Sequence, residues 1–155
     1  MSLLTACITT FNRPELLQES IESLVNQTYK DFDILILNNG NDEETKNMIK
    51  FYMKKNTRLI AINHEPISIS KQRNLALKKV KTKYIGFLDD DDLWAPNKVE
   101  EFYKQFSFFQ NNLAFFYSGF CFFKQINKSR RLFYKKIYDP KSNLKELLIQ
   151  RGDFT

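Results

Sequence analysis

The stretch that decides the fold is YIGFLDDDDLW, residues 84–94. Its first half is a short apolar run, which predicts a buried strand from Tyr84 to Leu88. Four successive carboxylates, Asp89 to Asp92, follow directly, although like charges repel and stability alone would not favour them. Hard oxygen ligands so close together suit Mg²⁺ or Mn²⁺, which complete their coordination with phosphate and water. The sequence therefore predicts a divalent cation site at the end of this strand.

Two other interpretations of the acidic run are weaker. A solvated acidic loop would not need the apolar residues that flank the carboxylates on both sides. An EF-hand loop that begins at Asp89 would need glycine at its sixth position, where Trp94 stands.

Outward from this stretch, apolar strand-like runs alternate with helical spacing along the chain. Strands are expected at 3–9, 32–37, 58–63, 84–88 and 113–123. Helices are expected after Pro14, over 43–55, from Ser68 or Ser70, after Pro96, and near 144–149, with Asn12 and Asp42 as candidate caps. This alternation predicts an α/β fold with a mainly parallel sheet and helices on both faces.

Ligands of such sheets lie beyond the carboxyl ends of the strands. That rule selects three loops, 10–13, 38–42 and 89–92. They hold polar residues that neither a strand nor a helix core would need. The loops are therefore expected to meet in one site.

The composition, 43% hydrophobic and 27% charged in 155 residues, is typical of one globular domain. No apolar stretch reaches about twenty residues and no signal peptide is evident, so a cytoplasmic protein is expected. Cys7 and Cys121 lie in apolar runs and are expected to be buried free thiols. Residues 124–151 hold nine Lys or Arg and two acids, the whole positive excess. This segment is a solvated surface by default, with peripheral contact to an anionic inner membrane face as the minority option.

Five motifs follow one another along the chain: TTFNRP at 9–14, QTY with DF at 27–32, NNGN at 38–41, RN at 73–74 and the run at 84–94. In this order, over residues 4 to about 123, the chain resembles the inverting family 2 glycosyltransferases with their GT-A fold. The resemblance implies a nucleotide-sugar donor, expected to be a UDP-sugar, a Mn²⁺ or Mg²⁺ cofactor and a cell-surface glycan or lipid-linked acceptor. It implies no nucleic-acid partner.

The resemblance also assigns roles. Thr9 and Phe11 would line the nucleobase pocket, and Arg73 would approach the nucleotide. Asp90 would contact the ribose, while Asp91 and Asp89 would hold the metal at the diphosphate. Asn39 stands where the family has an aspartate that accepts a hydrogen bond from uracil. The amide of Asn39 can both accept and donate a hydrogen bond there, so the nucleobase could be uracil or another base.

An inverting transfer needs a general base near the acceptor hydroxyl. No residue of 124–155 matches the family's carboxylate base, so the catalytic residue is unknown. The expectation is a nucleotide-sugar-binding domain at 1–123 and the start of the acceptor half at 124–155, with truncation at the C-terminus. Such a chain would bind donor and transfer sugar negligibly. The alternatives are a binding fragment without turnover and a nucleic-acid-binding protein acting through its basic tail.

Overall fold

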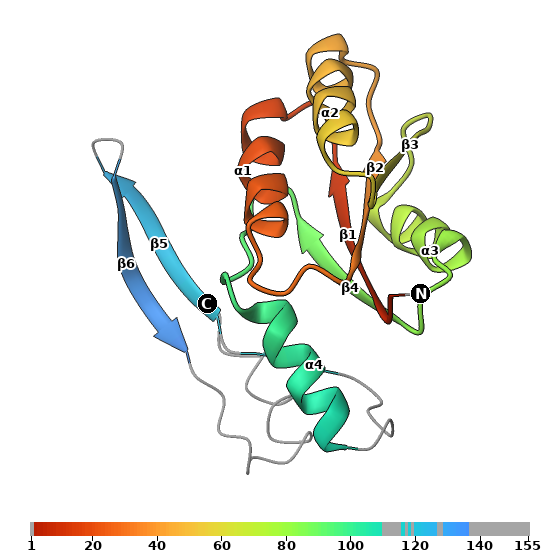
Figure 1. Ribbon diagram of the computed structural model, residues 1–155. Helices are drawn as coiled ribbons and strands as arrows, with labels where there is room; N and C mark the ends of the chain where they lie inside the picture. Colours follow the sequence, from red (N-terminus) through yellow and green to blue (C-terminus); the bar gives the residue numbers. More distant parts are fainter. Residues whose placement is uncertain (1, 110–115, 117, 119, 127–128, 137–155) are drawn as a thin grey trace. The chain divides into compact units, whose positions relative to one another are not determined.

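The computed structural model describes residues 2–109, 116, 118, 120–126 and 129–136. The chain divides into two compact units, Met1–Asn111 and Asn112–Thr155. The first unit carries four strands and four helices within its described residues (Figure 1). In chain order they are β1 (Leu4–Thr10), α1 (Pro14–Val25), β2 (Asp33–Asn38), α2 (Glu43–Lys55), β3 (Leu59–Asn63), α3 (Ile69–Lys79), β4 (Tyr84–Asp89) and α4 (Lys98–Phe108).

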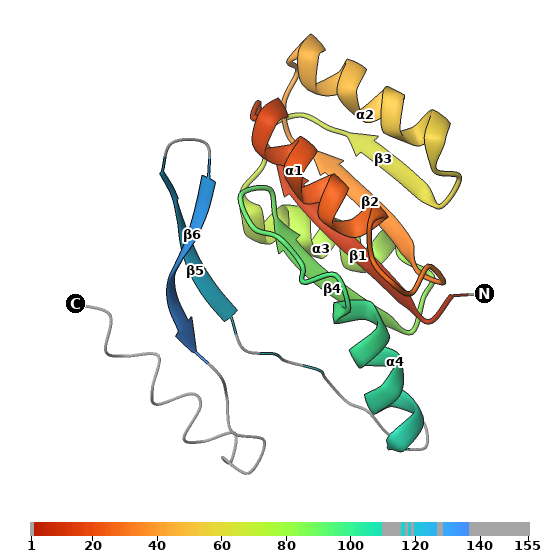
Figure 2. The ribbon, with the colours of Figure 1, turned by 60° about the vertical axis from the view of Figure 1, so that its left-hand side comes forward.

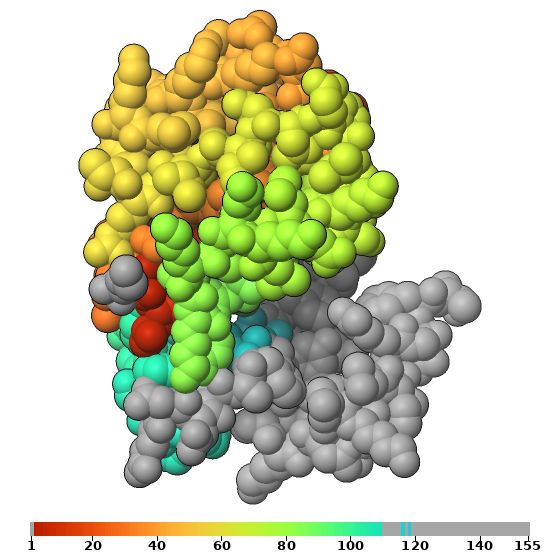
Figure 3. Space-filling model, turned by 90° about the vertical axis from the view of Figure 1, so that its right-hand side faces the viewer, coloured from red at the N-terminus to blue at the C-terminus, as the bar shows by residue number. Residues whose placement is uncertain are grey.

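The four strands form one parallel sheet in the order β3-β2-β1-β4. Helices α1 and α2 lie side by side on one face, and α3 lies on the opposite face (Figure 2). Figure 3 shows the face that α3 covers. The expected α/β fold with a parallel sheet and helices on both faces is thus confirmed.

The strands contribute side chains to the core on both faces of the sheet, because successive side chains point to opposite faces. Every residue of β1 is buried, and Cys7, Leu35 and Leu37 pack against Ala76 under α3. Strand residues of the other parity, such as Ile8 and Ile36, are equally buried on the face of α1 and α2. Since β1 lies between β2 and β4, its carboxyl end lies at the centre of the edge where the strands end and where a ligand is expected.

Two of the helices begin at the N-cap residues that the sequence indicates, and α1 does not. Asp42 caps α2 and Ser68 caps α3 through their side chains, as the sequence indicates. Asn12 does not cap α1. The cap position is Arg13, which makes no side-chain cap bond, and Pro14 begins the helix. Asn12 instead adopts a left-handed φ of 51°, and its side-chain oxygen lies against Gly40, where a Cβ would collide with it.

In the second unit, β5 (Phe120–Ile126) pairs antiparallel with β6 (Ser129–Lys136). The expectation of a fifth strand over 113–123 in the parallel sheet is therefore wrong for its described part. Only residues 127 and 128 separate the two strands, and so short a connection joins antiparallel neighbours. Residues 113–115, 117 and 119 and the helix expected near 144–149 lie outside the described residues. The expected domain division after Phe123 falls within β5 and stays a prediction.

Candidate functional site

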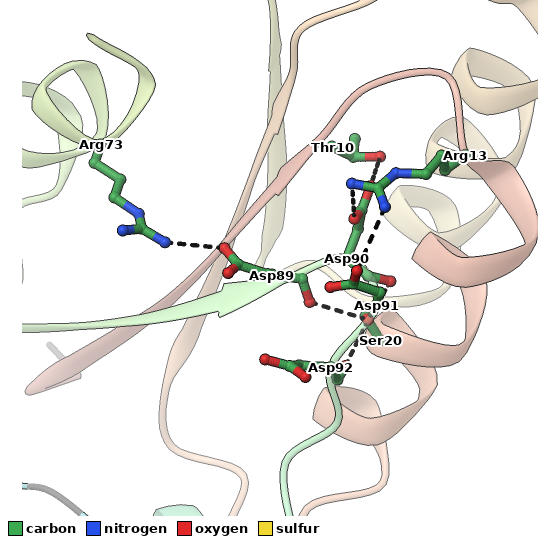
Figure 4. Close-up of polar contacts among 8 residues, drawn as sticks. All are labelled: Thr10, Arg13, Ser20, Arg73, Asp89, Asp90, Asp91 and Asp92. Atoms are coloured by element: carbon green, nitrogen blue, oxygen red, sulfur yellow. Dashed lines mark hydrogen bonds and ion pairs between the residues drawn. The ribbon is translucent and has the colours of Figure 1, made fainter. Parts of the chain in front are cut away.

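The acidic run forms a tight turn at the carboxyl end of β4. The Asp92 amide donates to the Asp89 carbonyl oxygen over 3.0 Å, so the chain reverses across the two residues between them. The turn sends neighbouring carboxylates in different directions. Figure 4 shows Asp89 directed to Arg73 on α3 and Asp90 directed to Thr10 and Arg13 on the other side. The four acids therefore occupy four different environments.

Asp90 is the buried member of the run, with 1% of its surface exposed. The Thr10 hydroxyl donates to its Oδ2 over 2.7 Å, and the Arg13 guanidinium lies 2.9 Å from its Oδ1. Burial raises the pKa of Asp90, and the hydrogen bond from Thr10 and the charge of Arg13 oppose that rise. The carboxylate is therefore fixed in orientation by residues of β1 and the loop after it.

Asp89 faces the other helix layer. Arg73 Nη2 donates to Asp89 Oδ1 over 3.0 Å, and the same guanidinium lies over the ring of Phe87, 5.5 Å from its centroid. Arg73 was expected to approach the nucleotide. In this structure it holds Asp89, and it is not among the residues that line the pocket described below.

Asp91 is the most open of these carboxylates with an ion-pair partner. Its side chain is 54% exposed, and its contact is with Arg13 Nη1 at 3.4 Å. Asp92 also lies at the surface. The pKa of Asp92 is raised first by burial and then by the neighbouring charges of Asp91 and Asp89. Among the three carboxylates with an ion-pair partner, Asp91 is thus the most accessible to an incoming cation.

Two contacts that the sequence did not indicate support the acidic turn. Ser20, fully buried on α1, places its hydroxyl 2.8 Å from the Asp90 carbonyl oxygen and 2.7 Å from that of Asp92 (Figure 4). Trp94 lies on β4 at Gly86, where a Cβ would stand 2.7 Å from the indole ring. A lone serine in a helix carries no sequence signal for such a role, because its partners are about 70 residues away.

A pocket of about 250 Å³ opens beside the turn. Its walls come from the ends of β1 and β4, the loop after β1 and the first turn of α3. It is lined by Thr9, Thr10, Phe11, Arg13, Ile69, Gln72, Asp89, Asp90 and Asp91. Five of the seven residues expected from the sequence, Thr9, Phe11, Asp89, Asp90 and Asp91, therefore lie around one pocket. Gln72 and Ile69 were not expected.

Asn39 is placed differently. It is buried, its Nδ2 donates to the Ile67 carbonyl oxygen over 2.9 Å, and its Oδ1 accepts from the Ile67 amide over 2.8 Å. Both polar atoms of its side chain are thereby engaged with the loop before α3. Asn39 is not among the residues that line the 250 Å³ pocket, so its role at a base stays a prediction.

The carboxylates of the pocket are suited to a cation whose remaining ligands are phosphate oxygens and water. Within the described residues, no group of three His, Cys, Asp or Glu side chains is arranged to hold a metal ion. Asp91 and Asp89 both line the pocket, and Mg²⁺ or Mn²⁺ commonly uses one or two carboxylates together with phosphate oxygens and water. The donor set is therefore suitable for a metal that binds with a diphosphate.

Several known glycosyltransferases are similar to this chain in sequence or in fold. Glycosyltransferase MJ1057 of Methanocaldococcus jannaschii, itself uncharacterised, is 41% identical over 113 residues, which are 71% of this chain and 38% of that protein. WfaP of Escherichia coli, a UDP-Glc:α-D-GlcNAc-diphosphoundecaprenol β-1,3-glucosyltransferase, is 33% identical over 77% of this chain and 47% of its own length. The mannosyltransferase PcManGT of Pyrobaculum calidifontis, solved with GDP-Man and Mn²⁺, superposes with a TM-score of 0.61 at 17% identity, over 68% of this chain and 32% of that one.

The fold and the family match define a protein of the GT-A glycosyltransferase class. The model of glycosyl transferase family 2 matches residues 5–153, and the chain belongs to that family. It spans less than half the length of the two relatives named above.

Proposed function

We propose that the chain binds a nucleoside-diphosphate sugar and a divalent cation in the 250 Å³ pocket, as the donor-binding part of an inverting glycosyltransferase. The observation that carries the proposal is the position of Asp91. Its exposed carboxylate lines the pocket together with Thr9 and Phe11, at the carboxyl ends of neighbouring strands. A diphosphate could there contact a cation held by Asp91 while its base reaches Phe11.

The pocket lining combines apolar and acidic side chains. Phe11 is 50% exposed and Ile69 is 46% exposed, so a flat apolar base can cover them. Of the carboxylates in the same lining, Asp89 and Asp91 would hold the cation, and the fixed carboxylate of Asp90 would accept from a ribose hydroxyl. When bound, the metal would stabilise the negative charge that develops on the diphosphate leaving group. Arg13 would then be free to turn towards the phosphates.

The similar proteins support a nucleotide-sugar donor of either of two bases. WfaP is named for UDP-Glc and PcManGT was solved with GDP-Man. The acceptor that we propose, a lipid-linked sugar, rests on the name of WfaP. No helix among the described residues has the length and apolar character to cross a membrane. Contact of the basic residues 124–151 with an anionic membrane surface remains part of the proposal.

Calorimetric titration tests donor binding. UDP, GDP, CDP and ADP are titrated into the chain with Mn²⁺ and again with a chelator. We expect at least one of them to bind, and to bind more weakly without the cation. Failure of all four to bind in the presence of Mn²⁺ would contradict the proposal.

Transfer is measured separately from binding. Radiolabelled UDP-sugar or GDP-sugar and a lipid-linked acceptor are incubated with the chain and with a form extended beyond Thr155. Labelled lipid product from either form supports a transferase. Binding without product from both forms would favour a nucleotide-sugar-binding module instead.

A further inference from the structure

Gln72 is a buried amide in the wall of the pocket. It belongs to the first turn of α3, and only 5% of its surface is exposed. Thr9, Phe11 and Ile69 line the same pocket with it. A long polar side chain is rarely buried to this extent unless its polar atoms have partners.

Only one end of this amide is engaged within the described residues. Its Nε2 lies 3.5 Å from the Ile67 carbonyl oxygen, whereas its Oε1 is buried and has no hydrogen-bond partner there. The Ile67 carbonyl also fixes which end is which. If the amide were flipped, Oε1 would face another acceptor, so the free atom is the oxygen.

Asn39 shows the contrast. Both ends of its amide bind the backbone of Ile67, at 2.9 and 2.8 Å, and Ile67 thus orients both side chains. Both polar atoms of the Asn39 amide are bound by the protein, whereas Gln72, a residue of the pocket lining, retains an acceptor without a partner among the described residues. A buried acceptor without a donor is destabilising, which indicates that the donor comes from a ligand.

The character of the required donor is restricted. A carbonyl oxygen accepts from N–H or O–H and repels the oxygens of a phosphate. The pocket lining also holds Phe11 and Ile69, whose exposed apolar surfaces suit a planar base, and Gln72 belongs to the same helix turn as Ile69. The group that meets Gln72 should therefore be a donor on the base.

We propose that Gln72 determines which base the bound nucleotide sugar carries, because the Oε1 atom of Gln72 accepts a hydrogen bond from a ring N–H of that base. Uracil and guanine carry such a ring N–H on the edge used for base pairing, whereas cytosine and adenine carry a bare acceptor nitrogen there. The inference rests on the proposed function, since it requires that a nucleotide occupies the pocket. It assigns to Gln72 the base recognition that the family resemblance implied for Asn39.

The test compares Gln72→Met with the unchanged chain. Methionine keeps the length of the side chain and lacks the strong acceptor. Affinities for UDP, GDP, CDP and ADP are measured by calorimetry with Mn²⁺. Inorganic pyrophosphate serves as a ligand without a base, and Gln18→Met is a matched substitution at an exposed position on α1. We expect the unchanged chain to prefer UDP or GDP over CDP and ADP by about tenfold or more.

In Gln72→Met this preference should disappear, with pyrophosphate affinity unchanged and Gln18→Met behaving as the unchanged chain. Three results would overturn the inference. They are nucleotide binding without base preference, a preference that survives in Gln72→Met, and an equal loss for all four nucleotides, which would place the acceptor against a group common to them. Absence of all nucleotide binding would instead remove the proposed function, and the inference with it.

A second measurement needs no variant, in case Gln72→Met fails to fold. UDP or GDP, whichever binds better, is compared on the unchanged chain with its analogue methylated at the ring N–H. Methylation should weaken binding by about tenfold or more. Equal binding of both forms would overturn the inference.

Discussion

The guanidinium of Arg13 lies 2.9 Å from the carboxylate of Asp90, an exposed cation placed over an anion that is 1% exposed. The same guanidinium reaches Asp91 at 3.4 Å. One flexible side chain therefore neutralises both the fixed carboxylate and the accessible one. A divalent cation that binds Asp91 must compete with it.

Replacement of Arg13 should strengthen cation binding in the absence of nucleotide. In Arg13→Gln, the positive charge beside Asp91 is gone, and the affinity for Mn²⁺ alone should rise about fivefold, from about 1 kcal/mol of lost repulsion at an exposed site. Arg58→Gln, which removes an arginine paired with Asp31 instead, is the control. Equal Mn²⁺ affinities in both variants would show that Arg13 does not compete.

Asp91→Asn should remove the Mn²⁺-dependent part of nucleoside diphosphate affinity. The side chain is 54% exposed, so the free energy of unfolding should change little. Titration with and without Mn²⁺, together with urea unfolding, measures both effects. Asp31→Asn changes an exposed aspartate outside the pocket and should bind as the unchanged chain does. Retention of the full Mn²⁺ effect in Asp91→Asn would exclude Asp91 as a metal ligand.

Asn39→Asp should destabilise the fold. A carboxylate can still accept from the Ile67 amide but cannot donate to the Ile67 carbonyl oxygen, so two acceptors face each other. We expect a loss of about 1–3 kcal/mol in the free energy of unfolding, measured by urea denaturation. Asn41→Asp, at an exposed position of the same loop beside Lys46, should cost nothing. Stability equal to that of the unchanged chain in Asn39→Asp would contradict the assigned contacts.

Gly86→Ala should displace the only tryptophan. The added Cβ would stand 2.7 Å from the Trp94 ring, which must shift or strain the turn that follows β4. We expect about 1–3 kcal/mol of destabilisation and a change in tryptophan emission. In a Trp94→Phe background the smaller ring leaves room, so the added cost of Gly86→Ala should be smaller. Strictly additive losses would argue against the contact.

The thiol of Cys7 should be protected until the protein unfolds. Burial raises its pKa from 9.0 to about 12. In a Cys121→Ser background, a thiol reagent at pH 8 should modify Cys7 only as fast as the protein unfolds. Because the pKa of the Cys7 thiol is higher in the folded than in the unfolded state, the neutral thiol adds to the free energy of unfolding. This contribution is complete below pH 9 and is lost as the pH rises towards 12. Rapid labelling of the folded protein would contradict this burial.

Much of the framework could be predicted because its signals are local. Buried strands, the caps Asp42 and Ser68 and the position of the acidic run at a strand end depend on neighbours a few residues away. The β5–β6 pairing was missed because an apolar run alone does not reveal its partner strand. Local pattern thus predicts the elements and their order, while pairing beyond the alternating units requires the fold.

The sequence by itself determined the parallel sheet and the positions of loops 10–13 and 89–92 at the strand ends, because hydrophobic period and strand–helix alternation leave few arrangements. Both of these loops line the pocket, and the third expected loop, 38–42, does not. The tertiary structure decided which partner each polar group has. Thr10 and Asp90, 80 residues apart, meet through the register of β1 with β4, and Ile67 takes both ends of the Asn39 amide while leaving Gln72 an unused acceptor. Such contacts depend on side-chain packing between remote segments, and no local pattern encodes them.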